Sequence, residues 1–269
     1  MRIHARNSKR PVLFITFLIC LCLFAGCAKD PAAKDYDRAE ELLSQGEYVE
    51  ALKRYYTITN DFPGSEYAPK SQYKIGIIFN NYFHDRKRAI SAFRAVFFVY
   101  PNSPEALLAK KELAGIYSNF GDHRKALAEY QWLLKQSTSL DAPEYKFLIA
   151  MEYVKMNDFR QARIELDDII KTTGSMDMIA EAKIEAANTY YLEGDVKTAM
   201  EGYDEIIEKF PDHKAAIDAK FNKARALEET GRLAEAQGVL KKLLPDYPYK
   251  PVIILKLQSI EQRLKEGED

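Results

Sequence analysis

A six-residue pattern that ends in alanine recurs six times along this chain of 269 residues. Its first copy is Gly46–Ala51 and its fifth is Gly194–Ala199. A large apolar side chain, such as Tyr55 or Phe93, stands one helical turn after each alanine. The repeat alanines lie about 37 residues apart, at Ala51, Ala89, Ala126, Ala162, Ala199 and Ala236. Self-similarity at a fixed period of this length indicates a solenoid, in which each repeat buries its apolar face against its neighbours.

Each repeat carries the start and stop signals of two helices. Gly or Asn begins most copies, as at Gly46 and Asn157, and readily adopts the positive φ that ends a helix. Proline follows the second half of four repeats, for example at Pro63 and Pro101, and cannot continue a helix. The apolar residues between these signals fall at helical spacing. Each repeat is therefore predicted to be an antiparallel pair of helices that cross closely at the small alanines.

The segment after the sixth repeat has a single apolar stripe. Ile253, Leu257, Ile260 and Leu264 fall on one helical face, and the opposite face is polar. A solenoid exposes apolar surface at its end unless a capping element covers it. The sequence therefore predicts an all-α fold of about six helix pairs, each about 37 residues long, plus a C-terminal capping helix. The predicted limits are residues 32–68, 69–106, 107–142, 143–179, 180–216 and 217–250 for the repeats, and 251–269 for the capping helix and tail.

The N-terminal region has the features of a targeting segment. Residues 1–10 carry four basic side chains and no acid, and Val12–Ala25 is an apolar run. Fourteen residues of helix span about 21 Å, which is shorter than the roughly 30 Å hydrocarbon core of a bilayer. A basic region before such a short apolar run is typical of a secretory signal peptide, predicted here as residues 1–26.

The apolar run ends in Leu23–Cys27, where small residues precede a cysteine, and no cysteine follows it in the chain. This segment resembles the bacterial lipobox, with Phe24 where leucine is usual. The resemblance implies that Cys27 carries a diacylglycerol and a palmitate-type chain, and that residues 27–31 form a lipidated tether. Ala28 directly after the cysteine implies the outer membrane, facing the periplasm, in an organism with two membranes. The alternative is an ordinary secretory signal with an incidental cysteine.

The body, residues 32–250, resembles the tetratricopeptide repeat, which is a helix pair usually of 34 residues. The longer unit and its Tyr-Pro or Phe-Pro ending, as at Phe62-Pro63 and Tyr247-Pro248, are similar to the periplasmic repeats of the BamD and CpoB kind. The chain as a whole therefore resembles a tetratricopeptide-repeat bacterial lipoprotein of the BamD-like outer-membrane family. The resemblance implies a scaffold that binds other proteins.

Catalytic and cofactor motifs are absent from the sequence. It has no Gly-rich phosphate loop and no paired histidines at metal-ligand spacing. His84, His123 and His213 are isolated in or near turns and are interpreted as solvated loop residues. With 39 basic and 40 acidic side chains, the chain offers no electrostatic basis for binding nucleic acid. We expect no enzyme activity, no cofactor, no metal site and no small-molecule substrate.

Function is therefore expected on the solenoid surface. Repeat proteins of this type bind extended or helical segments on the face lined by the first helix of each pair. The repeat register places ten residues toward that face: Tyr73, Asn80, Lys111, Ser118, Asn119, Met151, Lys155, Asn188, Tyr191 and Arg225. The second helix of repeat two is apolar nearly all round, so Phe98 and Val99 are predicted to form an exposed apolar patch.

The leading functional hypothesis is a lipid-anchored, periplasm-facing scaffold in the assembly of outer-membrane β-barrel proteins. Its partners would be the barrel assembly protein or unfolded barrel substrates, and it would reach the membrane through its lipid anchor. Two alternatives of the same class are a pilotin-like scaffold for a pilus secretin and a CpoB-like coordinator of the envelope and cell division. An alternative of another class is a solute-binding or peptidoglycan-active lipoprotein.

Overall fold

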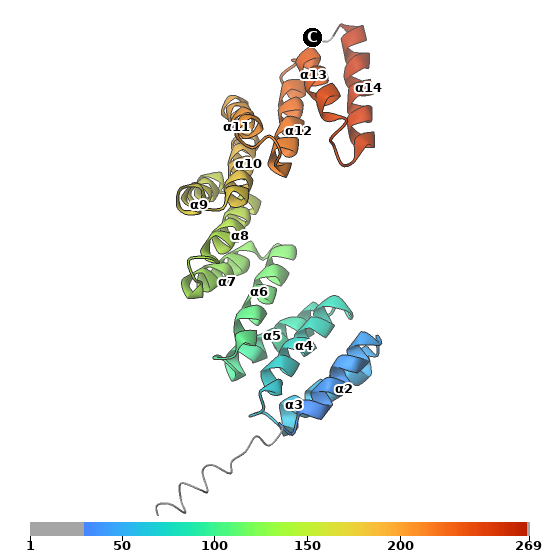
Figure 1. Cartoon of the computed structure of the whole chain (residues 1–269), viewed down its shortest axis with the longest axis vertical. Coiled ribbons are helices and arrows are strands. Elements are labelled where there is room, and N and C mark those ends of the chain that lie inside the picture. Colours follow the sequence, from blue (N-terminus) through green and yellow to red (C-terminus); the bar gives the residue numbers. More distant parts are fainter. Residues whose placement is uncertain (1–29, 268–269) are drawn as a thin grey trace, which may run out of the picture. The chain divides into compact units, whose positions relative to one another are not determined.

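The structure of the protein is a computed structural model, and the description below concerns residues 30–267. All regular elements within these residues are helices, and there are thirteen of them (Figure 1). They are α2 (Ala33–Ser44), α3 (Tyr48–Asp61), α4 (Tyr67–Asn81), α5 (Arg86–Val99), α6 (Pro104–Asn119), α7 (His123–Gln136), α8 (Ala142–Lys155), α9 (Phe159–Thr172), α10 (Met176–Glu193), α11 (Val196–Lys209), α12 (Lys214–Glu229), α13 (Leu233–Leu243) and α14 (Lys250–Glu266). The predicted signal peptide and Cys27 lie outside the described residues.

The six repeat alanines are all fully buried, which explains why the sequence keeps them small. Each lies in the second helix of a pair and packs toward the first helix. The predicted turn residues adopt a left-handed backbone, with φ of +81° at Gly46 and +58° at Asn157. In the second repeat His84 takes this place, with φ of +52°. Both the close helix crossings and the tight turns therefore follow from residues that the sequence repeats.

The chain divides into two compact units, and the first extends to Ala106. It contains α2–α5, which pack in chain order, each helix against the next. Helices α4 and α5 approach each other closely at Gly76 of α4. A Cβ atom at this position would lie 2.5 Å from the ring of Phe93 in α5. Only glycine allows this ring to lie against the α4 backbone.

The second unit begins at Leu107, in the first turn of α6, and contains the remaining helices. Consecutive helices pack together from α7 to α14, and α10 also contacts α8 and α12, the first helices of the pairs on either side. The capping helix α14 buries Ile253 and Ile260 in a cluster with Leu240 and Leu243 of α13. This confirms the predicted all-α class, the six helix pairs and the capping helix. The exact repeat limits stay a prediction, because helix bounds do not define where one repeat ends.

Across residues 30–267, no helix combines the length and apolar character that a membrane span requires.

Candidate protein-binding groove

The ten predicted groove residues all lie on the first helices of their pairs. Tyr73 and Asn80 lie on α4 in the first unit, and the other eight lie on α6, α8, α10 and α12 in the second. In the first unit the ring of Tyr73 lies 5.7 Å from that of Phe93, so it packs toward α5. Asn80 donates a hydrogen bond to the neighbouring Asn81. The second unit therefore carries most of the candidate surface.

Ser118 and Lys155 meet at a buried carboxylate that the sequence analysis did not single out. Glu152 of α8 is 2% exposed, and its Oε1 accepts hydrogen bonds from Ser118 Oγ at 2.6 Å and from Lys155 Nζ at 2.8 Å. Lys155 Nζ also lies 2.5 Å from Ser118 Oγ. These two predicted groove residues therefore join α6 to α8.

The other oxygen of Glu152 lies 2.9 Å from Nδ1 of His123, the first residue of α7. Burial by itself raises the pKa of the Glu152 carboxyl, but the hydrogen bonds from Lys155, Ser118 and His123 outweigh burial and hold this pKa below its usual value. The interpretation of His123 as a solvated loop residue is wrong, because its side chain is only 24% exposed and contacts this carboxylate. His213 is also partly buried, and its Nδ1 accepts a hydrogen bond from the backbone of Ala215.

The repeat alignment contains a signal that points to Glu152. Glu152 stands in the register of Phe79, Ile116, Thr189 and Ala226, which are all buried, whereas the first repeat has the exposed Glu41 there. A glutamate where four other repeats place buried, mostly apolar residues indicates a carboxylate that needs polar partners, because buried ionised groups are almost always paired.

Asn188 has a similar joining role further along the second unit. Its Oδ1 accepts hydrogen bonds from Tyr203 of α11 at 3.0 Å and from Asn222 of α12 at 2.9 Å. On the same pair of first helices, the guanidinium of Arg225 lies 5.4 Å from the ring centroid of Tyr191. Burial and the charge of Glu229 raise the pKa of Tyr191 to about 12, so its hydroxyl stays protonated at neutral pH. These side chains therefore fix the spacing of neighbouring repeats.

Within each of the two units, a row of ion pairs links neighbouring helices. Lys74 of α4 pairs with Glu40 of α2 at 2.8 Å, Lys214 of α12 with Glu181 of α10 at 2.6 Å, and Lys256 of α14 with Glu228 of α12 at 2.7 Å. The predicted groove residue Lys111 joins this row through Glu144 of α8, at 2.7 Å. In each unit, these charged side chains of the first helices are therefore paired within the protein.

The remaining predicted residues differ in accessibility. Asn119 at the end of α6 is exposed, whereas Met151 packs on an apolar cluster formed by α8, α9 and α10. The predicted apolar patch of the first unit is exposed, with Phe98 at 75% and Val99 at 60%. Within the described residues, no group of three or more side chains is arranged to hold a metal ion.

Comparisons with known proteins agree with this architecture. A tetratricopeptide-repeat family model matches residues 181–213, which contain most of α10 and all of α11. A comparison with curated proteins gives no match.

Solved structures of repeat proteins cover most of the chain. A tetratricopeptide repeat protein from Parabacteroides merdae is 15% identical over 88% of this chain and 87% of its own, with a TM-score of 0.65. The C-terminal part of a repeat-containing protein from Cytophaga hutchinsonii is 15% identical, covers 91% and 95% of the two chains, and has a TM-score of 0.65. PilW, a type IV pilus biogenesis factor, is 15% identical over 87% and 99%, with a TM-score of 0.57.

The chain therefore has the fold of a tetratricopeptide-repeat solenoid. Residues 181–213 also match the tetratricopeptide-repeat family model in sequence.

Proposed function

We propose that this protein is a lipid-anchored scaffold that holds partner proteins of a bacterial envelope machine at the inner face of the outer membrane. The observation that carries this proposal is the combination of a lipobox-like segment ending at Cys27 with a body made of repeat helices. A lipid anchor places the body at a membrane, and a repeat scaffold acts by binding other proteins.

The first candidate machine is the one that assembles outer-membrane β-barrel proteins. Support comes from the resemblance of the chain to BamD-like lipoproteins in its anchor, its period and its Tyr-Pro repeat endings. In this role the partner is the barrel assembly protein or an unfolded barrel chain. Exposed polar side chains of the first helices, such as Asn119 of α6, offer polar contacts to such a segment.

The second candidate machine assembles a pilus. Two observations favour it: the similarity to PilW extends over 99% of that chain, and the described residues form six helix pairs, the number that pilotin-like lipoproteins carry. In this role the partner is a pilus secretin. The anchor and the binding surface would be the same in both machines.

Cross-linked co-purification from native membranes, with a tag at the C-terminus, tests the proposal and separates the machines. Recovery of the barrel assembly protein supports the first candidate, and recovery of a secretin supports the second. If cell-division or peptidoglycan proteins are recovered and neither of these partners is, the result would overturn both candidate machines and favour the CpoB-like coordinator.

A variant pair tests whether the face of the first helices makes the contact. Asn119→Arg combined with Lys111→Glu changes two exposed residues of α6. Lys197→Glu on α11, whose side chain is 88% exposed, is a matched control on a second helix. We expect loss of the cross-linked partner in the double variant and retention in the control. Equal recovery from both variants would exclude this face as the docking surface.

A further inference from the structure

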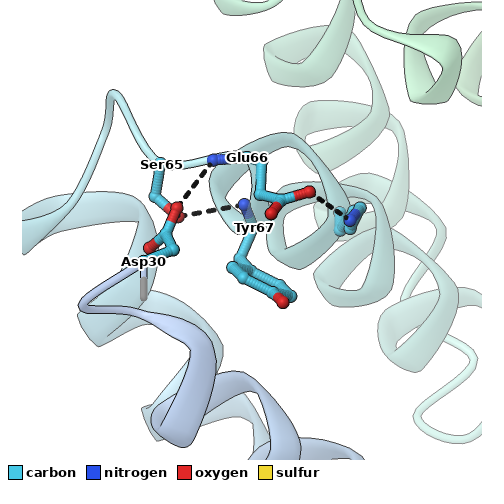
Figure 2. Close-up of polar contacts among 5 residues, drawn as sticks. Asp30, Ser65, Glu66 and Tyr67 are labelled. Atoms are coloured by element: carbon cyan, nitrogen blue, oxygen red, sulfur yellow. Dashed lines mark hydrogen bonds and ion pairs between the residues drawn. The ribbon is translucent and has the colours of Figure 1, made fainter. Parts of the chain in front are cut away.

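The N-terminal segment of the described chain is held to the body by the carboxylate of Asp30 (Figure 2). Both of its oxygens lie 2.8 Å from Ser65 Oγ, and Oδ2 accepts from the backbone N–H of Glu66 at 3.2 Å. Oδ1 also accepts from the N–H of Ala32 at 2.9 Å. Asp30 thus connects the beginning of α2 to the turn between α3 and α4, 35 residues further along.

The contacts around Asp30 provide hydrogen-bond acceptors for backbone N–H groups at the starts of two helices, α2 and α4. The backbone oxygen of Asp30 accepts from Ala33 in the first turn of α2. Ser65 in turn accepts from the N–H of Tyr67, where α4 begins. Partial burial raises the pKa of Asp30, but the hydrogen bonds from Ala32, Ser65 and Glu66 outweigh it, so this pKa lies below its ordinary value. The carboxylate is therefore ionised, and accepts all of these bonds, at neutral pH.

The distance between this contact and the proposed anchor is set by covalent geometry. Three peptide units separate Cys27 from Asp30, and in any conformation they span at most about 11 Å. We infer that the turn formed by residues 62–66 is the part of the first unit that is held at the bilayer surface, because Asp30 fastens the lipidated segment to it. This inference rests on the proposed lipid anchor at Cys27.

The tip of the turn is uncharged and lies between two acids, of which the exposed Asp61 precedes it. This tip, residues 62–64, has no charged side chain, and Pro63 and Gly64 are exposed. The single acid that follows, Glu66, is paired with Lys70 at 3.2 Å. The three residues of the tip itself therefore add no charge that would repel anionic lipid headgroups. The turn at the other end of α2 lies about 18 Å away along the helix.

Site-specific fluorescence in the full-length lipoprotein tests this inference. The chain has no cysteine after Cys27, so an introduced thiol is unique once the signal peptide is removed and Cys27 is acylated. Gly64→Cys places a fluorophore on the turn, where an added side chain meets nothing within 4 Å. Glu47→Cys places the same label on the exposed turn at the other end of α2. The protein is reconstituted in anionic vesicles that carry a nitroxide quencher on the lipid headgroups. Separately, the mass of the N-terminal peptide shows whether Cys27 is acylated.

We expect quenching at position 64 to exceed that at position 47 at least about twofold, given the separation of the two turns. Asp30→Ala, combined with the label at 64, should abolish this excess because it frees the tether. Asp37→Ala, which removes an exposed acid of α2, should preserve it. Far-ultraviolet circular dichroism checks that all variants remain helical.

The outcomes separate this inference from the proposed function. Acylated protein with equal quenching at the two positions, or with an excess that survives Asp30→Ala, would overturn the inference and leave the lipid anchor intact. Protein without an acyl chain on Cys27 would overturn the proposed anchoring and the inference with it.

Discussion

Ser118 donates a hydrogen bond of 2.6 Å to Glu152, and this bond joins α6 to α8 across two successive repeats. Glu152 is almost completely buried, so its charge depends on the donors that surround it. Lys155 supplies a second bond to the same oxygen, and His123 faces the other. A polar cluster of this kind holds repeats in one register, because an unpaired buried carboxylate is costly.

Glu152→Ala should destabilise the protein by about 2 kcal/mol, because it removes a buried acceptor and leaves its donors without their shared partner. The free energy of unfolding from urea denaturation checks this. Glu201→Ala on α11 is the control, since its side chain is 67% exposed and only a long ion pair is lost. Equal effects of the two substitutions would contradict a structural role for the Glu152 cluster.

The same carboxylate should make stability depend on pH. Because the pKa of Glu152 is lowered by folding, its ionised form stabilises the protein above the unfolded value of about 4.3. This stabilisation is lost as the pH falls through the lower folded pKa. The difference in free energy of unfolding between the wild type and Glu152→Gln should therefore be large at pH 7 and small in strong acid. A difference that stays constant with pH would argue against this.

The sequence predicted the repeat architecture because its signals are local. An alanine at a helix crossing, or a glycine or asparagine in a left-handed turn, acts through neighbours one or two turns away. The fully buried Ala51 and Ala199 and the positive φ of Gly46 confirm these predictions. The second repeat shows that the same backbone forms with His84 in the turn.

The polar contacts between repeats could not be derived in the same way. They join residues 28 to 34 positions apart, and their geometry depends on how far each helix is rotated against the next. The register placed Tyr73 among the groove residues, but the structure adds a contact with Phe93 that the register did not indicate. Gly76 lies one turn after Tyr73 on α4 and lets Phe93 approach both residues. The binding role of the predicted groove stays a prediction.

Glu185 on α10 should show the opposite pH dependence to Glu152. Burial is the largest cause that raises the pKa of Glu185, and the nearby charges of Asp218 and Glu181 raise this pKa further. A raised folded pKa means that ionisation opposes folding, and this penalty appears as the pH rises above about 4.3. Glu185→Gln should therefore increase the free energy of unfolding at pH 7 and leave it unchanged near pH 3.5.

The hydrogen bond of 3.3 Å that Asn188 donates to Glu185 has an acceptor in the glutamine variant as well. The expected gain therefore isolates the cost of the charge. Glu201→Gln, at an exposed site of α11, is the matched control and should change stability little at either pH. A loss of stability in Glu185→Gln at pH 7 would show that the ionised carboxylate stabilises the fold.

Two glycines in helices should respond in opposite directions when they are changed to alanine. At Gly76 the new Cβ would lie 2.5 Å from the buried ring of Phe93, so α4 and α5 must move apart. Overpacking of this kind costs about 1 to 3 kcal/mol. At Gly115 in α6 the Cβ meets nothing within 4 Å, and alanine should stabilise the helix by about 0.5 to 1 kcal/mol. Thermal unfolding of the two variants measures both effects. An unchanged melting temperature for Gly76→Ala would mean that Phe93 adopts another position at little cost, and that the close approach of α4 and α5 is not required by the fold.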